Sequence, residues 1–533
     1  MSDIEFKYTP IEEIDKKVAR CEAFYFNKQK RFAQHPDPAK ADQEFRLTQL
    51  KKLYNSVRAN YDYVLEAMFD DFHRAHQESV SIEVVPLLND ILRMIECLPK
   101  WMKPQRIRDW SPAFMFGDIK VEKIARGCAA VISPFNFPLL LCLTPVANAI
   151  AAGNTVVIKP SELTPHTALA IEKVIADANF PEGLAEIVQG SIPENTALIN
   201  NPKLDMIFYT GSPRVGSIVA QAAAKNLVPC VLELGGKSPT FMTGSFNVHN
   251  RGLLRTALKR IMFGAFSNGG QICVSPDYLL VHESIYDKVA EEAKNVLNEL
   301  FPTFDVDLSY THIINERAYD NLMNKLKNTN GEKFVPASAA DFDEKEHSGE
   351  SYCIPPTIVF NCTWDDCLMK EENFGPILPV IKYTDLDETL DTVVKNHDTP
   401  LVQYIFSGSD SEAKHIMARI RSGDCLINDT VIHVGVQEAP FGGIGTSGYG
   451  NYGGVHGFNA FTHERTVFKQ PFWVDKFMGM RYLPYSAEKI KMVRMATEKR
   501  PFFDERGQTH WYRRPFVYIA SALTLLSLGF LLL

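Results

Sequence analysis

Four short stretches decide the fold: GCAAVISPFNFP (127–138), GNTVVIKPS (153–161), GLAEIVQG (183–190) and LDMIFYTGSPRVG (204–216). Each is an apolar or β-branched run that ends in Gly, Pro or Asn, which is typical of a buried strand entering a turn. Helical stretches such as LTPHTALAIEKVIADANF (163–180) lie between them. Strands and helices alternating at this spacing predict βαβ units and a parallel sheet buried on both faces. Such a sheet binds its ligand at the carboxyl ends of the strands, so we expect a nucleotide site there.

The composition excludes several classes of protein. The chain has 533 residues, of which 45% are apolar and 23% charged. This is an ordinary globular composition, and the length predicts a multi-lobed body with a large buried core. With 64 acidic and 56 basic residues, the net charge is −8. A chain without a basic excess lacks the electrostatic footprint that holds nucleic-acid phosphates, so we expect no nucleic-acid partner.

The cysteines and the first residues indicate where the protein is made. Ten cysteines occur without a C-x-x-C pair, which favours a reducing compartment. The beginning, MSDIEFKYTPIEEIDKK, lacks an apolar core and an Arg-rich pattern, so we expect neither a secretory signal nor a transit peptide. Synthesis is therefore expected to finish in the cytosol.

The last residues have a different character. Residues 516–533 carry no charge, and eleven of them are Leu, Ile, Val or Phe. As a helix they would span about 27 Å, and the eleven would contribute about −3 to −6 kcal/mol to membrane insertion. A buried C-terminal helix is the alternative, but such a helix normally keeps one polar face. With Arg513 and Arg514 before the segment, we predict a tail anchor over 515–533 that leaves the bulk of the chain facing the cytosol.

The first 115 or so residues are predicted to be mainly helical. The stretch 47–72, LTQLKKLYNSVRANYDYVLEAMFDDF, has apolar residues spaced three and four apart with charges between them. His73 and His76 follow it, but no carboxylate or cysteine cluster at ligand spacing accompanies them. We therefore expect a surface pair and no metal site.

Three features of the middle of the chain can carry chemistry. Gly211 and Gly216 flank a turn that enters an Ala-rich helix, which suits an anion at a helix N-terminus or simply a helix cap. Glu233 ends an apolar run, as a structural acid or a general base would. Cys273 follows Gly269 and Gly270, where the backbone can bend and expose a thiol, although most single cysteines are inert core residues.

Seven segments together carry a family resemblance. They are PFNFP, KPSE, FYTGSPRVG, LELGGKSP, FSNGGQICVSPDY, EENFGPILP and PFGGIGTSGYG, in this order. They resemble the signature segments of the NAD(P)-dependent aldehyde dehydrogenase superfamily, with a match from about residue 40 to 485. VSPDY, SGDCLINDTVIH, GTSGYGNYGGVHGF and MRYLPYSAEK, followed by the hydrophobic tail, are similar to the dimeric branch that includes membrane-bound fatty aldehyde dehydrogenases.

The resemblance implies a role for each matched residue. Cys273 would be the nucleophile, Glu233 the general base and Asn136 an oxyanion-hole donor. Residues matching the NAD-binding positions are Lys159 and Glu162 at the adenosine ribose, Gly211, Ser212, Pro213, Arg214, Val215 and Gly216 beside the phosphates, and Glu372 and Phe374 at the nicotinamide ribose. Because a carboxylate at Glu162 would repel a 2′-phosphate, we expect NAD, with NADP as the alternative since Lys159 partly offsets that repulsion.

The resemblance also implies an architecture. The expected fold is α/β, with a Rossmann-like cofactor domain, an α/β catalytic domain, a small β oligomerisation element and the C-terminal transmembrane helix. The expected segments are the N-terminal helices and dinucleotide-binding domain (1–233, with a bridging β segment near 105–125), the catalytic domain (234–430), an oligomerisation and return segment (431–484), a gate helix or plain linker (485–514) and the tail anchor (515–533). A homodimer is expected.

These features predict oxidation of long-chain aldehydes to carboxylic acids through a cysteine thiohemiacetal and thioester. Such aldehydes partition into membranes, where an anchored enzyme meets them at high local concentration. The membrane would be the mitochondrial outer membrane, the endoplasmic reticulum or a lipid-droplet surface. The alternatives are oxidation of aromatic or medium-chain aldehydes, a CoA-acylating reaction, against which Glu233 argues, and a non-enzymatic tethered scaffold, which would be expected to lose Cys273, Glu233 or Asn136.

Overall fold

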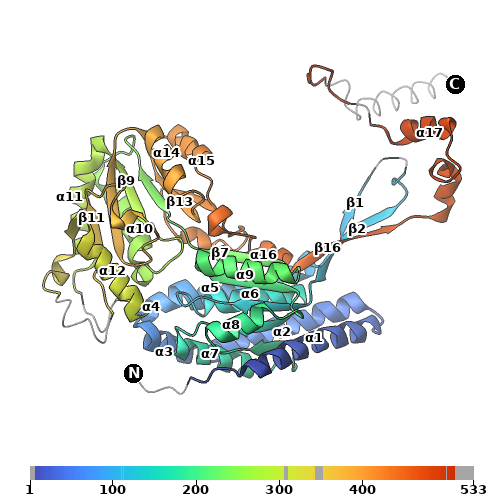
Figure 1. The fold of residues 1–533 in the computed structure, drawn as a ribbon, viewed down its shortest axis with the longest axis horizontal. Coiled ribbons are helices and arrows are strands. Elements are labelled where there is room, and N and C mark those ends of the chain that lie inside the picture. The colour runs from blue at the N-terminus through green and yellow to red at the C-terminus, as the bar shows by residue number, and fades with distance from the viewer. Residues whose placement is uncertain are drawn as a thin grey trace. The chain divides into compact units, whose positions relative to one another are not determined.

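The computed structural model describes residues 6–109, 111, 113–304, 310–342, 352–499 and 501–510. The chain divides into two compact units, and each is described by itself. The larger unit comprises residues 1–102 and 123–463, and the smaller comprises residues 103–122 and 464–533. The larger unit contains two mainly parallel sheets with helices around them (Figure 1).

Four strands of the first sheet, β3 to β6, come from the stretches that predicted the fold. Its six strands lie in the order β15-β7-β6-β3-β4-β5, and all neighbours run parallel except β15, which is antiparallel to β7. The strands are β3 (Cys128–Ile132), β4 (Thr155–Lys159), β5 (Ala185–Ile187), β6 (Met206–Gly211), β7 (Cys230–Leu234) and β15 (Gly448–Tyr449).

Helices cover both faces of this sheet because its strands are apolar on both sides. In β3, Ala129 and Val131 join one hydrophobic core, and Ala130 and Ile132 join the other. The first core includes α2 (Pro38–Ala59), α3 (Tyr61–Phe72), α5 (Val85–Trp101), α6 (Leu140–Ala152), α7 (Pro165–Asp177) and α16 (Gly454–Ala460). The second includes α1 (Ile11–Ala33), α8 (Ile192–Ile199) and α9 (Pro213–Lys225). The short helix α4 (His76–Ser79) and the π-helical turn η1 (Val80–Val84) lead into α5.

The strand order determines where a ligand binds. From β3 the chain adds β4 and β5 on one side of the sheet, then returns to add β6 and β7 on the other. The order therefore reverses between β3 and β6, and the loops after these two strands diverge to open a crevice. PFNFP (134–138) follows β3, and the turn into α9 follows β6.

The second sheet has seven strands in the order β10-β11-β12-β9-β8-β13-β14, of which only β10 is antiparallel to its neighbour. These are β8 (Pro239–Met242), β9 (Tyr278–His282), β10 (Glu332–Phe334), β11 (Thr357–Phe360), β12 (Ile377–Tyr383), β13 (Val402–Phe406) and β14 (Asp424–Ile427). One face packs on α10 (Arg251–Phe266) and α11 (Glu283–Leu300). The other packs on α12 (Glu316–Asn328), α14 (Leu386–Asn396) and α15 (Asp410–Arg419).

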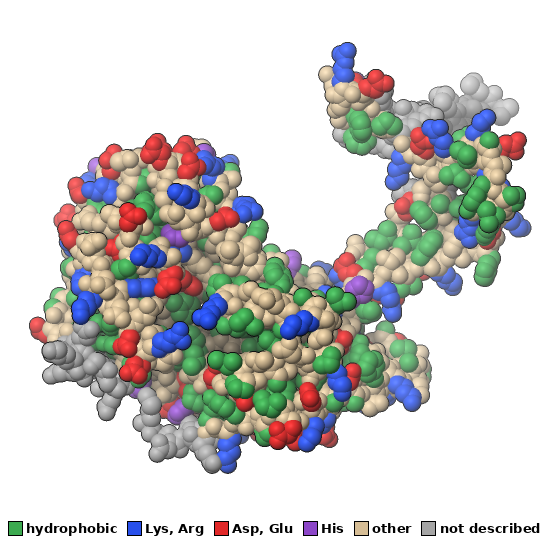
Figure 2. Space-filling model, in the orientation of Figure 1, with side chains coloured by type: hydrophobic (Ala, Val, Ile, Leu, Met, Phe, Trp, Pro, Cys, Tyr) green, Lys and Arg blue, Asp and Glu red, His purple; other side chains and the backbone are tan. Residues whose placement is uncertain are grey.

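The smaller unit is built on a three-stranded sheet in the order β1-β2-β16. Its strands are β1 (Gln105–Ile107), β2 (Asp118–Ala125) and β16 (Thr462–Lys469), and its helix is α17 (Ala487–Thr497). Large apolar side chains are exposed on this unit, including Phe472 at 96% and Met495 at 81%. Hydrophobic side chains are correspondingly visible on the C-terminal segment in Figure 2, whereas acidic and basic side chains alternate over much of the remaining face.

The α/β architecture with Rossmann-like sheets confirms that part of the sequence prediction. The predicted tail anchor, 515–533, lies outside the described residues, as do all residues from 511 onward. Among the helices that the structure does describe, none combines the length and the apolar character needed to cross a membrane. Within the predicted gate or linker segment, the structure places α17.

Candidate active site

One large cavity in the larger unit gathers most of the residues that the sequence singled out. Its volume is about 1300 Å³, and it is lined from both sheets. The predicted residues that line it are Asn136, Lys159, Glu162, Gly211, Ser212, Arg214, Val215, Glu233, Cys273, Glu372 and Phe374. Pro213 and Gly216 do not line it, because Pro213 begins α9 and Gly216 faces the side chain of Leu234.

Cys273 lies in the loop between the turn η2 (Ser267–Gly270) and β9. Asn268, Gly269 and Gly270 all have left-handed backbone conformations, with φ of 53°, 60° and 69°. A Cβ at Gly270 would lie 2.2 Å from the carbonyl oxygen of Gly375, so only glycine fits there. Burial, with smaller contributions from the carboxylates of Glu372 and Glu233, raises the pKa of the Cys273 thiol to about 12. The thiol therefore needs a proton acceptor or a nearby positive charge before it can attack.

Glu233 lies near the end of β7 and is only 3% exposed. Neither of its carboxylate oxygens has a hydrogen-bond partner among the described residues. Burial, and to a smaller extent the charge of Asp424, raises its pKa well above the ordinary value. A carboxyl group with a raised pKa and free oxygens is suited to exchanging protons with a ligand.

Asp424 and His433 extend this polar region of the cavity. Asp424 begins β14, and its Oδ2 lies 3.5 Å from Nε2 of His433. Within the described part of the chain, neither ring nitrogen of His433 makes a hydrogen bond, and neither does Oδ2 of Asp424. Both residues line the cavity, although the sequence indicated no role for them beyond membership of the SGDCLINDTVIH segment.

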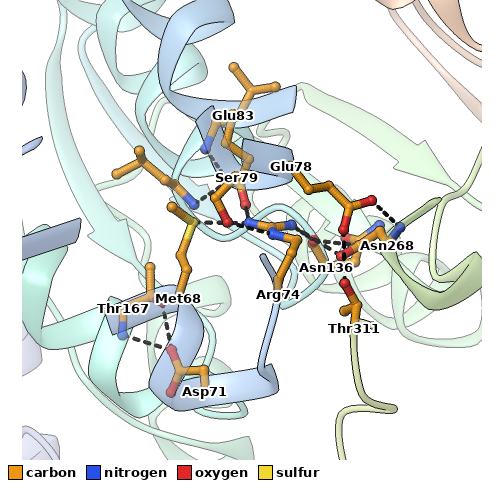
Figure 3. Close-up of polar contacts among 12 residues, drawn as sticks. Met68, Asp71, Arg74, Glu78, Ser79, Glu83, Asn136, Thr167, Asn268 and Thr311 are labelled. Carbon is orange, nitrogen blue, oxygen red and sulfur yellow. Dashed lines mark hydrogen bonds and ion pairs between the residues drawn. The ribbon is translucent and has the colours of Figure 1, made fainter. Parts of the chain in front are cut away.

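Asn136 is held very differently. It is 4% exposed, and its side-chain Nδ2 donates a hydrogen bond to the carbonyl oxygen of Gln271 at 3.0 Å. Gln271 lies two residues before Cys273, so this bond ties the PFNFP loop to the cysteine loop. Figure 3 shows further polar side chains around Asn136, namely Arg74, Glu83 and Asn268. None of these three was identified from the sequence.

The other predicted residues form an end of the site that suits a dinucleotide. Ser212 caps α9, because its Oγ accepts a hydrogen bond from the backbone N–H of Val215 at 3.4 Å. A Cβ at Gly216 would lie 2.6 Å from Leu234, so glycine allows α9 to approach β7 closely. Lys159, at the end of β4, forms an ion pair with Glu162. Burial lowers the pKa of Lys159, and Glu162 opposes that effect.

Glu372 and Phe374 lie on the loop before β12. A Cβ at Gly235 would lie 2.3 Å from the carboxylate of Glu372, so the two are in close contact. Burial and the charge of Asp277 raise the pKa of Glu372 to about 8. Phe374 has φ of 52°, which is strained for a non-glycine residue, and its ring packs edge-on against Phe135 at 5.8 Å. Among the described residues no cluster of His, Cys, Asp or Glu is placed to hold a metal ion.

The fold and the cavity define an α/β enzyme with a dinucleotide-type sheet and a cysteine between its two sheets. A sequence profile of the aldehyde dehydrogenase family matches residues 17–467. The chain belongs to this family and is an aldehyde dehydrogenase, as the seven signature segments predicted.

Known relatives cover nearly the whole chain. The fatty aldehyde dehydrogenase HFD1 of Saccharomyces cerevisiae is 55% identical over 98% of this chain and 97% of that protein. The β-apo-4′-carotenal oxygenase of Neurospora crassa is 36% identical over 94% of this chain and 89% of that protein. The substrate-bound structure of AldH from Staphylococcus aureus superposes with a TM-score of 0.81 at 35% identity, covering 90% of this chain and 99% of that one.

Proposed function

We propose that this aldehyde dehydrogenase oxidises long-chain aldehydes to carboxylic acids with NAD. The observation that carries the proposal is that Cys273, Glu233 and Asn136 line one cavity whose walls are largely apolar. Apolar side chains reach it from the helices and from the 431–436 segment, among them Ile82, Pro86, Met94, Leu140, Leu141, Val431, Ile432, Val434 and Val436. A hydrocarbon chain buried against such walls gains about 0.8 kcal/mol per methylene group. The 55% identity to a fatty aldehyde dehydrogenase supports the same substrate class.

The first step is attack by Cys273. Cys273 first loses its thiol proton to solvent, its thiolate sulfur then forms a bond to the aldehyde carbon, and the carbonyl electron pair moves to oxygen. The side-chain N–H of Asn136 and the backbone N–H of Cys273 donate to that oxyanion. Loss of one such donor typically costs about 3 to 4 kcal/mol of transition-state stabilisation.

A bound nicotinamide dinucleotide supplies the acceptor for the hydride that leaves the same carbon as the thioester forms on Cys273. The residues present fit such a group. Arg214 and Val215 line the cavity in the first turn of α9, and the N-terminus of a helix favours a phosphate. The carboxylate of Glu162, paired with Lys159 at the end of β4, favours a free ribose hydroxyl over a 2′-phosphate, and hence NAD over NADP.

Glu233 completes the cycle by removing a proton from the water that hydrolyses the thioester. The oxygens of its carboxylate have no competing partner among the described residues, so they are free to bind that water. The C–S bond breaks, the carboxylic acid leaves, Cys273 is again a thiolate, and the proton passes from Glu233 to solvent. Only the ionised form of Glu233 is a base, so its raised pKa makes turnover increase as the pH rises.

We further propose that the protein is a tail-anchored homodimer whose catalytic part faces the cytosol, at the mitochondrial outer membrane or the endoplasmic reticulum, with a lipid droplet as a third choice. The apolar sequence of 515–533 supports the anchor. The exposed Phe472, Phe477 and Leu483 of the smaller unit support contact with a second copy, because large exposed apolar patches usually mark interaction surfaces.

The test is NADH production by the full chain with hexanal, decanal and hexadecanal in detergent, compared with benzaldehyde. We expect kcat/KM to rise with chain length, and we expect the Cys273→Ser variant to lose at least about 10³-fold because a hydroxyl at that position has no thiolate character. A preference for benzaldehyde would instead favour the aromatic alternative. Parallel assays with NADP test the cofactor preference, and equal kcat/KM for the two cofactors would contradict the role of Glu162.

A further inference from the structure

The backbone and the side chain of Asn136 are both held from the loop that carries Cys273. The carbonyl oxygen of Asn136 accepts a hydrogen bond from Nδ2 of Asn268 at 2.9 Å, and a second from Nη1 of Arg74 at 3.2 Å (Figure 3). Its side-chain Nδ2 donates to the carbonyl oxygen of Gln271 at 3.0 Å. The position of the Asn136 carboxamide therefore depends on groups that do not line the cavity.

Asn268 joins the two loops with one side chain. Besides the bond to Asn136, its Nδ2 donates to the carbonyl oxygen of Gln271 at 3.2 Å, while its Oδ1 accepts from Nη1 of Arg74 at 3.1 Å. A guanidinium group only donates hydrogen bonds. Arg74 therefore requires the oxygen of the Asn268 carboxamide to face it, which turns the NH₂ group toward the two carbonyls.

Arg74 is itself fixed by a buried ion pair with Glu83, and both side chains are fully buried. The second carboxylate oxygen of Glu83 accepts the backbone N–H groups of Leu139 and Leu140, each at 2.9 Å. These two residues begin α6 directly after the PFNFP loop. The pair thus holds the loop from both ends, through the carbonyl of Asn136 and through the first turn of the helix that follows.

The backbone of Asn268 is also fixed. Its N–H donates to one carboxylate oxygen of Glu78 at 2.6 Å, and the other oxygen of Glu78 accepts the hydroxyl of Thr311 at 2.9 Å. Asn268 keeps a left-handed φ of 53°, which costs free energy for a non-glycine side chain. A strained, fully hydrogen-bonded residue that is 2% exposed is suited to fixing the distance between the Asn136 loop and the Cys273 loop.

We propose that Asn268, oriented by the Arg74–Glu83 pair, is a positioning residue that fixes the carboxamide of Asn136 relative to the thiol of Cys273. This inference rests on the proposed function, in which Asn136 donates to the oxyanion. A buried ion pair is expensive to desolvate and is often replaceable by apolar residues, so a geometric role accounts for it better than stability alone. A displacement of about 1 Å at such a donor reduces turnover by about 10²-fold.

The test substitution is Asn268→Asp. Aspartate has the same shape and still accepts from Arg74, but it replaces the donating NH₂ group with an oxygen that faces two carbonyls. We expect kcat to fall by about 10²-fold while KM for NAD stays within about twofold, because the cofactor end of the site is not touched. A change confined to KM for NAD, or an unchanged kcat, would overturn the proposal.

A double-mutant cycle with Asn136→Ala separates positioning from a general structural role. If Asn268 acts through Asn136, the double variant is no slower than Asn136→Ala alone, since there is no donor left to misplace. Two effects that multiply would overturn the proposal. If Asn136→Ala itself has full activity, the proposed function fails; if it is slow but Asn268→Asp is not, only the positioning role fails.

Asn154→Asp is the matched control. Asn154 is fully buried, its Nδ2 donates to the carbonyls of Ala149 at 3.2 Å and Phe461 at 2.9 Å, and its Oδ1 accepts from Gly127 at 2.9 Å. It does not line the cavity. We expect Asn154→Asp to lose about as much Tm as Asn268→Asp while its kcat below the melting transition is unchanged. If kcat falls equally in the two variants, lost stability explains both falls and the proposal is overturned.

Arg74→Lys is a second variant for the case in which Asn268→Asp does not fold. Lysine keeps the positive charge beside Glu83, but one ammonium group cannot reproduce the fork that reaches Ser79, Asn136 and Asn268. We expect a smaller fall in kcat, about tenfold, and the same non-additivity with Asn136→Ala. Full activity in this variant would contradict the orienting role of Arg74.

Discussion

Asn136 and Glu233 line the same cavity, yet their surroundings are opposite. The backbone and side chain of Asn136 are held by hydrogen bonds to Gln271, Asn268 and Arg74. The two oxygens of Glu233 have no hydrogen-bond partner in the described part of the chain, and the charge of Asp424 disfavours its ionised form.

The difference separates two requirements of one reaction. A donor that stabilises an oxyanion must be in place before the charge appears, and a saturated network keeps it there. A general base must instead gain and lose a proton, and a partner that satisfied its oxygens would compete with water. The buried Glu233 therefore retains free oxygens and a raised pKa, at the cost of stability.

The largest effect is expected for Glu233→Gln, which removes the proposed base and keeps its shape. Turnover should fall by about 10²- to 10⁴-fold, because the thioester is no longer hydrolysed. The first half-reaction should continue, so rapid mixing should show a burst of NADH no larger than one equivalent per subunit. Glu186→Gln is the control, because Glu186 pairs with Arg20 and does not line the cavity. Unchanged steady-state turnover in Glu233→Gln would show that Glu233 is not the general base.

Removing the carboxylate that holds Arg74 should also reduce stability. Glu83→Ala leaves Arg74 buried without its counter-ion and two backbone N–H groups without an acceptor. The free energy of unfolding should fall by about 3 to 5 kcal/mol, measured by urea denaturation of the full chain. Asp391→Ala, which breaks the exposed pair with Arg419, should change it much less. Equal losses in the two variants would show that burial gives the Arg74–Glu83 pair no special importance.

The smallest effect is expected for the pKa of Glu233, whose oxygens have no hydrogen-bond partner among the described residues. Asp424→Asn removes a negative charge that raises the pKa of Glu233, so that pKa should fall. The base is then ionised at lower pH, and the rising limb of the kcat profile should move to lower pH. Cys273 and Tyr452 also lie near Glu233. Burial raises the pKa of each, so neither adds a charge in the pH range of the rising limb.

Asp398→Asn is the control for that shift, because Asp398 pairs with Arg421 outside the cavity lining. Its kcat profile should superimpose on that of the unmodified chain. A shift of the Asp424→Asn profile to higher pH would show that the charge of Asp424 does not raise the pKa of Glu233.

The parts of the site that the sequence predicted are those marked by local chemistry. Cys273 follows two glycines, Glu233 ends an apolar strand and Ser212 precedes an Ala-rich helix, and each pattern is visible within a few residues. Asn268 lies inside FSNGGQIC, so its neighbourhood was recognised without its role. Arg74 and Glu83 gave no signal at all, because in sequence a charged residue on a helical stretch looks like a solvated one.

The sequence by itself determined the α/β fold and the family, and it indicated the residues proposed to attack, to donate and to accept a proton, because these depend on hydrophobic period and on residue type. Only the tertiary structure decided which polar groups are partnered and which are left free. Asn268 meets Asn136 across 132 positions and Arg74 across 194. Contacts of that separation depend on how the two sheets and the N-terminal helices pack, and packing is a property of the whole chain rather than of any short segment.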